Sequence, residues 1–186
     1  MKINIQSLEY PEKLRKIEKP PNQLYLKGNI ELLKKPAIAI IGSRKCTKYG
    51  EKIAKEFSKG LSLYGLTIIS GMAEGIDSFA HIGSMENCGN TIAVLPCGFN
   101  NIYPKKNINL YNQILDNNGL VITEYEKDEK ADSNKFLERN RIVSGLANGT
   151  LVIEGGYRSG TSVTANITKK QGKNVFCIPL WLKNFP

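Results

Sequence analysis

Histidine and paired cysteines are scarce in this sequence. His81 is the one histidine among 186 residues, and the four cysteines, at positions 46, 88, 97 and 177, form no C-x-x-C pair. Zinc sites are built from closely spaced cysteine and histidine ligands, so this spacing argues against a metal site. It also provides no disulfide framework, and we expect reduced thiols in a cytoplasmic protein.

Long apolar runs are missing as well. The first six residues, Met1 to Gln6, lack the apolar region of a signal peptide. No apolar run approaches the length of about 20 residues that a membrane-spanning helix needs. We therefore expect no membrane partner.

The motifs of nucleotide cofactors are absent too. Gly42-Ser43-Arg44 is not a G-x-G-x-x-G turn, no acidic residue ends the second predicted strand, and the turn from Gly156 to Gly160 lacks the following lysine of a P-loop. The sequence also shows no Ser–His–Asp arrangement and no carboxylate pair with credible spacing. These absences argue against NAD binding and ATP hydrolysis, and we expect no bound cofactor.

Acidic residues are outnumbered by basic ones. Lysine and arginine total 26 against 17 aspartates and glutamates, which leaves a formal charge of +9. A basic surface favours polyanionic partners such as nucleic acids. The alternative is that the abundant lysine and asparagine reflect genomic composition.

Short apolar runs that end in glycine turns recur along the chain and alternate with helical patterns. Strands are predicted at 38–41, 66–69, 91–95, 120–123, 150–153 and 174–178, and helices at 47–64, 76–88, 108–115, 135–147 and up to about 170. This alternation predicts an α/β domain over residues 36–186, an extended Rossmann-like three-layer fold with a mostly parallel sheet.

Residues 1–35 differ from this pattern. Pro11 and Pro20-Pro21 interrupt the segment, a short helix is predicted over 12–17, and a short strand over 24–26. Such a segment cannot bury a core of its own, so we expect an N-terminal lead-in segment packed on the main domain. The charged residues 125–134 predict a mobile loop.

The glycine turns are the candidate binding site. Right-handed crossovers bring the strand–helix turns to one edge of the sheet, where backbone N–H groups can meet a phosphate. The candidate phosphate-binding residues of these turns are Gly42, Ser43, Arg44, Gly71, Gly75, Gly155, Gly156, Ser159, Gly160 and Thr161. The alternative is that some of the glycines only permit tight connections, and that Arg44 is a solvated loop residue.

Two pairs of titratable residues, Arg139 with Arg141 and Asp77 with His81, could have either functional or structural roles. Arg139 and Arg141 lie on different sides of a predicted helix, so one is expected to face the cleft and the other to form an internal ion pair, for which Glu154 is a candidate partner. Asp77 and His81 could form an acid–base pair. We favour the structural alternative, in which Asp77 stabilises a helix N-terminus and His81 is its hydrogen-bonded partner.

Taken in order, the motifs resemble the DprA/Smf family of bacterial DNA-processing proteins, over nearly the whole chain. The motifs are Tyr10-Pro11 with Gly28-Asn29, Ile40-Ile41-Gly42-Ser43-Arg44 with Tyr49-Gly50, Ser70 to Asp77 with His81, Tyr103-Pro104 with Asn107, Arg139-Asn140-Arg141, and Ser159-Gly160-Thr161.

The resemblance implies a homodimer that binds single-stranded DNA, protects incoming DNA and loads the RecA recombinase in natural transformation, without catalysis. It marks Arg44 and Lys105 as DNA-pocket residues, although Lys106 adjoins the second. Phe99, Tyr103 and Tyr157 are candidates for stacking on bases. Because the sequence ends just past the last predicted strand, we expect no C-terminal winged-helix domain.

Two other functions are compatible with the same fold. Phosphoribohydrolases, often mislabelled lysine decarboxylases, act on nucleoside monophosphates and carry a Pro-Gly-Gly-x-Gly-Thr turn followed by a glutamate. Here the turn from Glu154 to Thr161 is longer, and Val163, Thr164 and Ala165 stand where that glutamate is expected. A sensor for a small nucleotide or nucleotide-sugar is the third reading.

Overall fold

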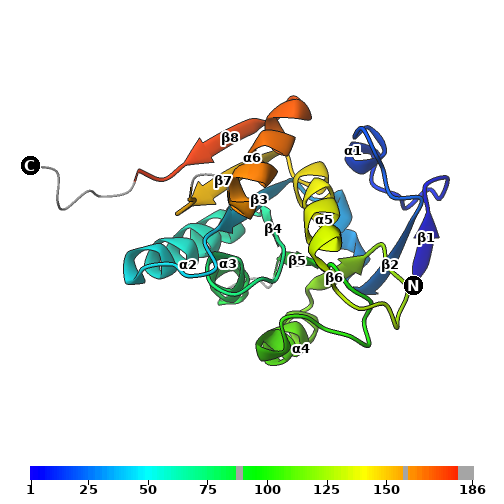
Figure 1. Ribbon diagram of the computed structural model, residues 1–186, viewed down its shortest axis with the longest axis horizontal. Coiled ribbons are helices and arrows are strands. Elements are labelled where there is room, and N and C mark those ends of the chain that lie inside the picture. Colours follow the sequence, from blue (N-terminus) through cyan, green and yellow to red (C-terminus); the bar gives the residue numbers. More distant parts are fainter. Residues whose placement is uncertain (87–89, 157–158, 180–186) are drawn as a thin grey trace, which may run out of the picture.

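An eight-stranded sheet runs through the molecule in the order β1-β2-β6-β5-β4-β3-β7-β8 (Figure 1). The structure is a computed structural model that describes residues 1–86, 90–156 and 159–179. The strands are β1 (Lys2–Asn4), β2 (Gln23–Gly28), β3 (Ala37–Gly42), β4 (Thr67–Ser70), β5 (Thr91–Val94), β6 (Leu120–Thr123), β7 (Gly149–Ile153) and β8 (Asn174–Cys177).

Helices cover both faces of this sheet. They are α1 (Glu12–Arg15), α2 (Lys48–Leu63), α3 (Ile76–Met85), α4 (Ile108–Asp116), α5 (Ser133–Leu146) and α6 (Gly160–Lys170), with short 3-10 turns η1 (Ile30–Lys34) and η2 (Lys105–Asn107). Ile40 packs with α2 and α3, whereas its neighbours Ala39 and Ile41 pack with α5 on the opposite face. This period-two alternation produces three layers, and the predicted Rossmann-like α/β fold is confirmed.

The strand order places a switch point between β3 and β7. From β3 the chain builds β4, β5 and β6 outward on one side, and then returns to add β7 and β8 on the other. The six strands from β3 to β8 are parallel. In open parallel sheets the connections on either side of such a point diverge, which leaves a crevice at the carboxyl ends of the strands.

Local signals set the ends of the helices. The Thr47 hydroxyl accepts a hydrogen bond from Gly50 N at 3.1 Å and caps α2, and Gly65, with φ +82°, follows the end of that helix. Asp132 caps α5 by accepting from Asn134 N and Lys135 N, both at 2.9 Å. The helix predicted over 76–88 ends at Met85, with Glu86 as its C-cap, and residues 87 and 88 of the prediction lie outside the described part.

The N-terminal segment joins the sheet. Strand β2 pairs antiparallel with β6, and β1 pairs antiparallel with β2. Leu14 and Leu24 are fully buried in one cluster with Ala39 of β3. The sequence predicted the strand over 24–26 but neither its pairing nor β1 and η1, and the division of the chain at residue 35 stays a prediction.

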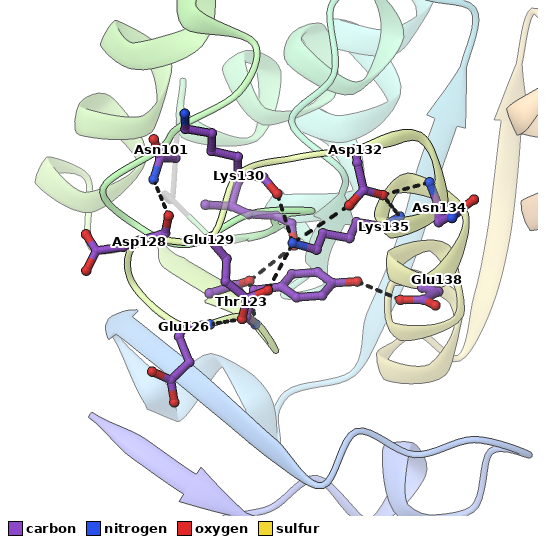
Figure 2. Close-up of polar contacts among 12 residues, drawn as sticks. Asn101, Thr123, Glu126, Asp128, Glu129, Lys130, Asp132, Asn134, Lys135 and Glu138 are labelled. Atoms are coloured by element: carbon purple, nitrogen blue, oxygen red, sulfur yellow. Dashed lines mark hydrogen bonds and ion pairs between the residues drawn. The ribbon is translucent and has the colours of Figure 1, made fainter.

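The charged segment after β6 is a loop with many polar contacts (Figure 2). The Lys135 ammonium donates to Glu129 Oε2 and to Lys130 O, both at 2.9 Å. Glu126 N donates to Glu129 Oε1, and Asn101 donates to Asp128 O. These bonds argue against the predicted mobility of the segment.

Candidate functional site

A cleft of about 330 Å³ opens at the switch point between β3 and β7. Its lining comes from four segments: residues 41–44 after β3, residues 71–77 around the start of α3, one face of α5, and the first turn of α6. These are the carboxyl ends of the strands, where the sequence placed the glycine turns. The cleft is therefore where the topology predicts it.

Hydrogen bonds fix the backbone of the turn after β3, and the Arg44 side chain extends from this turn toward solvent. Ser43 N donates to Glu154 O at 2.7 Å, and Ser43 O accepts from Ile76 N at 3.2 Å. Arg44 is exposed at the mouth, and its guanidinium carbon lies 5.1 Å from the centroid of the Phe136 ring. The arginine therefore presents a planar cation stacked on an aromatic face.

Several of the predicted glycines serve close contacts inside the protein. Gly75 has φ +78°, and a Cβ there would lie 2.3 Å from Ser43 O, so it lets the turns after β3 and β4 approach each other. A Cβ at Gly42 would lie 1.9 Å from Ile153 O, and one at Gly71 would lie 2.4 Å from the Arg139 guanidinium. By contrast, among the residues that the structure describes, a Cβ at Gly160 would meet nothing within 4 Å beyond its chain neighbours and its own helix.

The floor of the cleft carries a buried arginine beside a buried aspartate. Arg139 is 4% exposed and donates through Nη1 to Gly71 O and, at 2.5 Å, to Val94 O. Asp77 accepts from Gly71 N at 3.1 Å and Ala73 N at 3.4 Å. Burial raises the pKa of Asp77, and the nearby Arg139 charge opposes that shift. Of Arg139 and Arg141, Arg139 is therefore the one that lines the cleft.

Arg141 forms the internal ion pair, but not with the expected partner. Its two Nη atoms lie 2.8 and 2.7 Å from the two carboxylate oxygens of Glu124. Glu154 instead accepts from Thr47 N at 2.8 Å and from the Thr47 hydroxyl. The expected Glu154 partner was wrong, because its carboxylate lies at the N-terminus of α2, where backbone N–H groups attract it.

His81 contacts a threonine, and not Asp77. Its Nδ1 lies 2.6 Å from Thr91 Oγ1, which donates to Ile68 O. Burial lowers the pKa of His81 to about 3, and the Arg139 charge adds to the shift. The expected bond between His81 and Asp77 was wrong, and no acid–base pair forms, since the histidine faces β5.

The segment that carries Lys105 is fixed beside the mouth. Asn107 donates to Met72 O at 2.8 Å and to Ser78 Oγ at 2.9 Å. Lys106 lies 3.4 Å from Glu74, whereas exposed Lys105 forms no ion pair within the described residues. Of the two adjacent lysines, Lys105 is therefore the one whose charge is not already paired.

An aromatic pair completes the mouth. The Tyr103 ring, 46% exposed, meets the Phe136 ring edge-on, with centroids 5.5 Å apart and planes at 72°. Phe99 packs against the core, and Tyr157 lies outside the described residues. Arg44, Tyr103 and Phe136 also line a second, smaller hollow together with Glu74.

Phe136 was not among the aromatic candidates, although the sequence carries a signal for it. Phe136, Arg139, Asn140 and Val143 follow the spacing i, i+3, i+4, i+7 of one helical face, and all four line the cleft. This helical face includes Arg139 but not Arg141, so the same spacing identifies Arg139 and Phe136 together as residues that line the cleft.

The turn before α6 closes the cleft on its far side. Ser159, Gly160 and Thr161 line the cleft with Gly156, and Ser159 Oγ accepts from Ser162 N at 3.4 Å as the cap of α6. Gly155 does not line it, and a Cβ there would lie 3.1 Å from the Thr161 side chain. Part of the predicted turn, residues 157 and 158, lies outside the described residues.

The described ranges hold neither a candidate metal cluster nor a candidate membrane span. Over residues 1–86, 90–156 and 159–179, no three side chains of histidine, cysteine, aspartate or glutamate converge on a point that could hold a metal ion. None of the helices described there has the length and apolarity needed to span a bilayer.

Comparison with known proteins identifies the family. The family model of DNA recombination-mediator protein A matches residues 2–185. The chain belongs to this family. The resemblance drawn from the motifs is thereby confirmed.

Members of the family from several bacteria are similar to the chain. It is 42% identical to the DNA processing protein DprA of Streptococcus pneumoniae over 170 residues, which are 91% of this chain and 60% of that protein. It is 38% identical to protein Smf of Escherichia coli over 170 residues, 91% of this chain and 46% of that protein. The chain thus spans about half to three fifths of the length of these relatives.

Solved structures of the family share the fold. The X-ray structure of DprA from Streptococcus pneumoniae gives a TM-score of 0.92 at 38% identity, covering 99% of this chain and 64% of that one. DprA from Helicobacter pylori, whose structure is described for its single-stranded DNA binding mode, gives 0.89 at 31% identity, covering 99% and 83%. A molybdenum cofactor binding protein from Rippkaea orientalis, at 20% identity and a TM-score of 0.56, shares the fold alone.

Proposed function

We propose that this chain binds single-stranded DNA across the mouth of the cleft, as part of a DprA-type recombination mediator that protects incoming DNA and assists RecA loading in natural transformation. The observation that carries the proposal is the group formed by exposed Arg44 and Tyr103, which both contact the half-buried ring of Phe136. An unpaired strand offers bases that stack on aromatic rings, together with phosphates that bind cations. The mouth of the cleft offers aromatic rings for the bases and a cation for the phosphates, next to each other.

The charges at the mouth fit this ligand. The Arg44 guanidinium can bind a phosphate through two N–H groups while it stacks on Phe136. Lys105, on the rigid segment beside Tyr103, adds a second cation. The net charge of +9 supplies the long-range attraction that sequence-independent DNA binding requires.

The other predicted contact residues take different parts in the proposal. Gly156 and the turn from Ser159 to Thr161 would supply backbone N–H groups to phosphates. Ser43 N and Gly71 N already donate to Glu154 O and Asp77 Oδ2, so Gly42, Ser43 and Gly71 would shape the wall of the cleft. Gly155 would let the strand end approach the Thr161 side chain, and Gly75 would set the distance between two of the turns. Arg139 would contribute the buried surface at the bottom of the cleft, beside Asp77. Arg141 would act indirectly, since its charge is held by Glu124.

Partners and location come from the family. The family description names recombination mediation, and on the resemblance we propose a homodimer that meets RecA in the cytoplasm. We also propose that the chain acts without catalysis. In support, Asp77 is the one carboxylate among the described lining residues, and its Oδ2 faces two backbone N–H groups.

The proposal is tested by titrating labelled oligo-dT at two salt concentrations. The slope of log K against log salt is expected to be about −0.7 for each phosphate neutralised, and double-stranded competitor should displace the oligonucleotide poorly. Arg44→Ala is expected to weaken binding by about tenfold or more, which is the scale of one lost stacking and phosphate contact.

Lys127→Ala is the matched control, because it also removes one exposed cation, but from the loop over the end of β5. Equal losses in the two variants would show general charge attraction and would contradict the placement of DNA at the cleft. Release of free adenine on incubation with AMP would favour the phosphoribohydrolase alternative over the proposed function.

A further inference from the structure

Glu154 stands where the chain leaves β7, and it is not among the described residues that line the cleft. We propose that Glu154 is a positioning residue for DNA binding: it holds the turn that carries Arg44, so that the guanidinium stays stacked on Phe136 and free to meet a phosphate. This role rests on the proposed function, and it adds the residue that keeps Arg44 in place.

Glu154 is bonded to both ends of the turn from Ser43 to Thr47. Its backbone oxygen accepts from Ser43 N at 2.7 Å. Its carboxylate accepts from Thr47 N at 2.8 Å through Oε2 and from the Thr47 hydroxyl through Oε1. Arg44 lies between these two anchor points. The residue after β7 therefore fixes the path of a turn that ends 107 positions earlier in the sequence.

The bonds to Thr47 suit a carboxylate better than a neutral side chain. Thr47 is the cap of α2, where unpaired backbone N–H groups and the helix dipole favour negative charge. A hydrogen bond from a backbone N–H to a carboxylate is also stronger than one between neutral groups. Glutamine offers one acceptor oxygen where glutamate offers two, so a glutamine at position 154 cannot keep both bonds in this arrangement.

The backbone conformation of Glu154 is a second observation in favour of a role for its side chain. Its φ is +52°, in the left-handed region where glycine and asparagine are favoured and glutamate is uncommon. Such a conformation persists where the surroundings fix it, and it is often found at functional sites. Here the backbone oxygen and the carboxylate are both bonded to the turn that carries the exposed cation of the mouth.

Gly50 leaves the room that this carboxylate needs. A Cβ at Gly50 would lie 2.6 Å from Glu154 Cδ and 2.7 Å from Glu154 Oε1. Gly50 lies in the first part of α2, where alanine would favour the helix more than glycine does. The glycine therefore gives up helix propensity at a position where the close approach of Glu154 requires it.

A second anchor limits the size of the expected effect. Ser43 O accepts from Ile76 N at 3.2 Å, so part of the turn stays held when Glu154 is changed. The affinity falls in proportion to the fraction of molecules in which the turn is correctly placed. If Glu154 acts through Arg44, the loss on changing Glu154 cannot exceed the loss on removing the Arg44 side chain itself.

The test is a double-mutant cycle with labelled oligo-dT, made of Glu154→Gln, Arg44→Ala and the two changes together. We expect Glu154→Gln to weaken binding by about threefold to tenfold when Arg44 is present. When Arg44→Ala is already in place, the same change should weaken binding by less than about twofold, since residues that act together are not additive.

Glu56→Gln is the matched control. It also removes one carboxylate, but from the exposed surface of α2, where Glu56 lies 3.8 Å from Lys52. By charge alone, both glutamine variants would bind DNA slightly more tightly. Weaker binding in Glu154→Gln together with unchanged or tighter binding in Glu56→Gln therefore separates positioning from general charge.

Gly50→Ala displaces the carboxylate while Glu154 itself stays, and it should weaken oligo-dT binding in the same way. If Glu154→Gln fails to fold, the cycle of Gly50→Ala with Arg44→Ala makes the same comparison. Amide hydrogen exchange of the free protein adds a measurement without DNA. The Thr47 amide should exchange faster in Glu154→Gln and in Gly50→Ala, and at its original rate in Glu56→Gln.

Equal losses from Glu154→Gln with and without Arg44 would overturn the proposed positioning role. Unchanged oligo-dT binding in that variant, or an unchanged exchange rate at Thr47, would overturn it too. Failure of the proposed function is a different result, because the original protein itself would then not bind oligo-dT, whichever residue stands at position 154.

Discussion

Two glycines, each at a connection between a strand and the following helix, meet opposite environments in this molecule. After β5, Gly98 N donates to Glu129 O at 2.9 Å, and a Cβ at Gly98 would lie 1.9 Å from Glu126 O. At the start of α6, a Cβ at Gly160 would meet none of the described residues within 4 Å, apart from its chain neighbours and the backbone of its own helix. The space beside Gly98 is occupied by the backbone of the protein itself, whereas Gly160 lines the cleft.

Topology accounts for the difference. The loop of residues 124–132 follows β6, the neighbour of β5, and folds back over the end of β5. Between β3 and β7 the chain leaves in opposite directions, so no connection crosses the gap. A glycine turn thus marks a place where another group can come close to the backbone. The order of the strands decides whether that group is another segment of the protein or a ligand.

The largest expected effect is at the filled turn. Gly98→Ala should lower the free energy of unfolding by about 3 kcal/mol, because the backbone of Glu126 and Lys127 would have to move to admit the methyl group. Gly160→Ala, the matched change at the open turn, should alter it by no more than about 0.5 kcal/mol. Urea unfolding of both variants measures the contrast, and similar values would contradict it.

The layer beneath the cleft should respond to pH. Burial lowers the pKa of His81 to about 3 in the folded protein, against 6.5 for a histidine in water. The unfolded chain therefore binds a proton that the folded one excludes, so stability present above pH 6.5 is lost as the pH falls toward 3. The loss should be about 2 kcal/mol between pH 6.5 and 5.

His81→Gln is the variant that isolates this effect from the other titrating groups. It should remove that part of the pH dependence, which urea unfolding at pH 7.5, 6 and 5 would detect. Identical pH profiles for the variant and the original protein would rule out His81 as the source.

Of the variants expected to destabilise the protein, the smallest effect is expected in the surface network that covers the β5 turn. Lys135 is 19% exposed, bonds Glu129 and Lys130 O, and lies 4.8 Å from the centroid of the Tyr125 ring. Lys135→Met keeps the aliphatic stem and removes the charge, and should cost about 1 kcal/mol. If thermal melting shows a loss as large as that of Gly98→Ala, the network and not the backbone contact holds the loop over the turn.

Sequence reasoning performed well where the signal was local. Thr47, Gly65 and the apolar runs of β3 to β8 set elements whose positions agree with the structure to within a few residues. It failed where partners were distant. The ion pair between Arg141 and Glu124 joins α5 to the end of β6, and the bond between His81 and Thr91 joins α3 to β5. The pairing of β2 with β6 spans almost a hundred residues, and no periodicity reports it.

The sequence by itself determined the alternation of strands and helices, the excess of positive charge, the family, and the residues at the turns, since each depends on composition or on neighbours within a few positions. Only the tertiary structure decided that Arg139 forms the floor while Arg44 stacks on Phe136 at the mouth, and that Gly160 stays open while Gly98 is covered. Those outcomes depend on which strands lie side by side, and that order is fixed by packing over the whole chain.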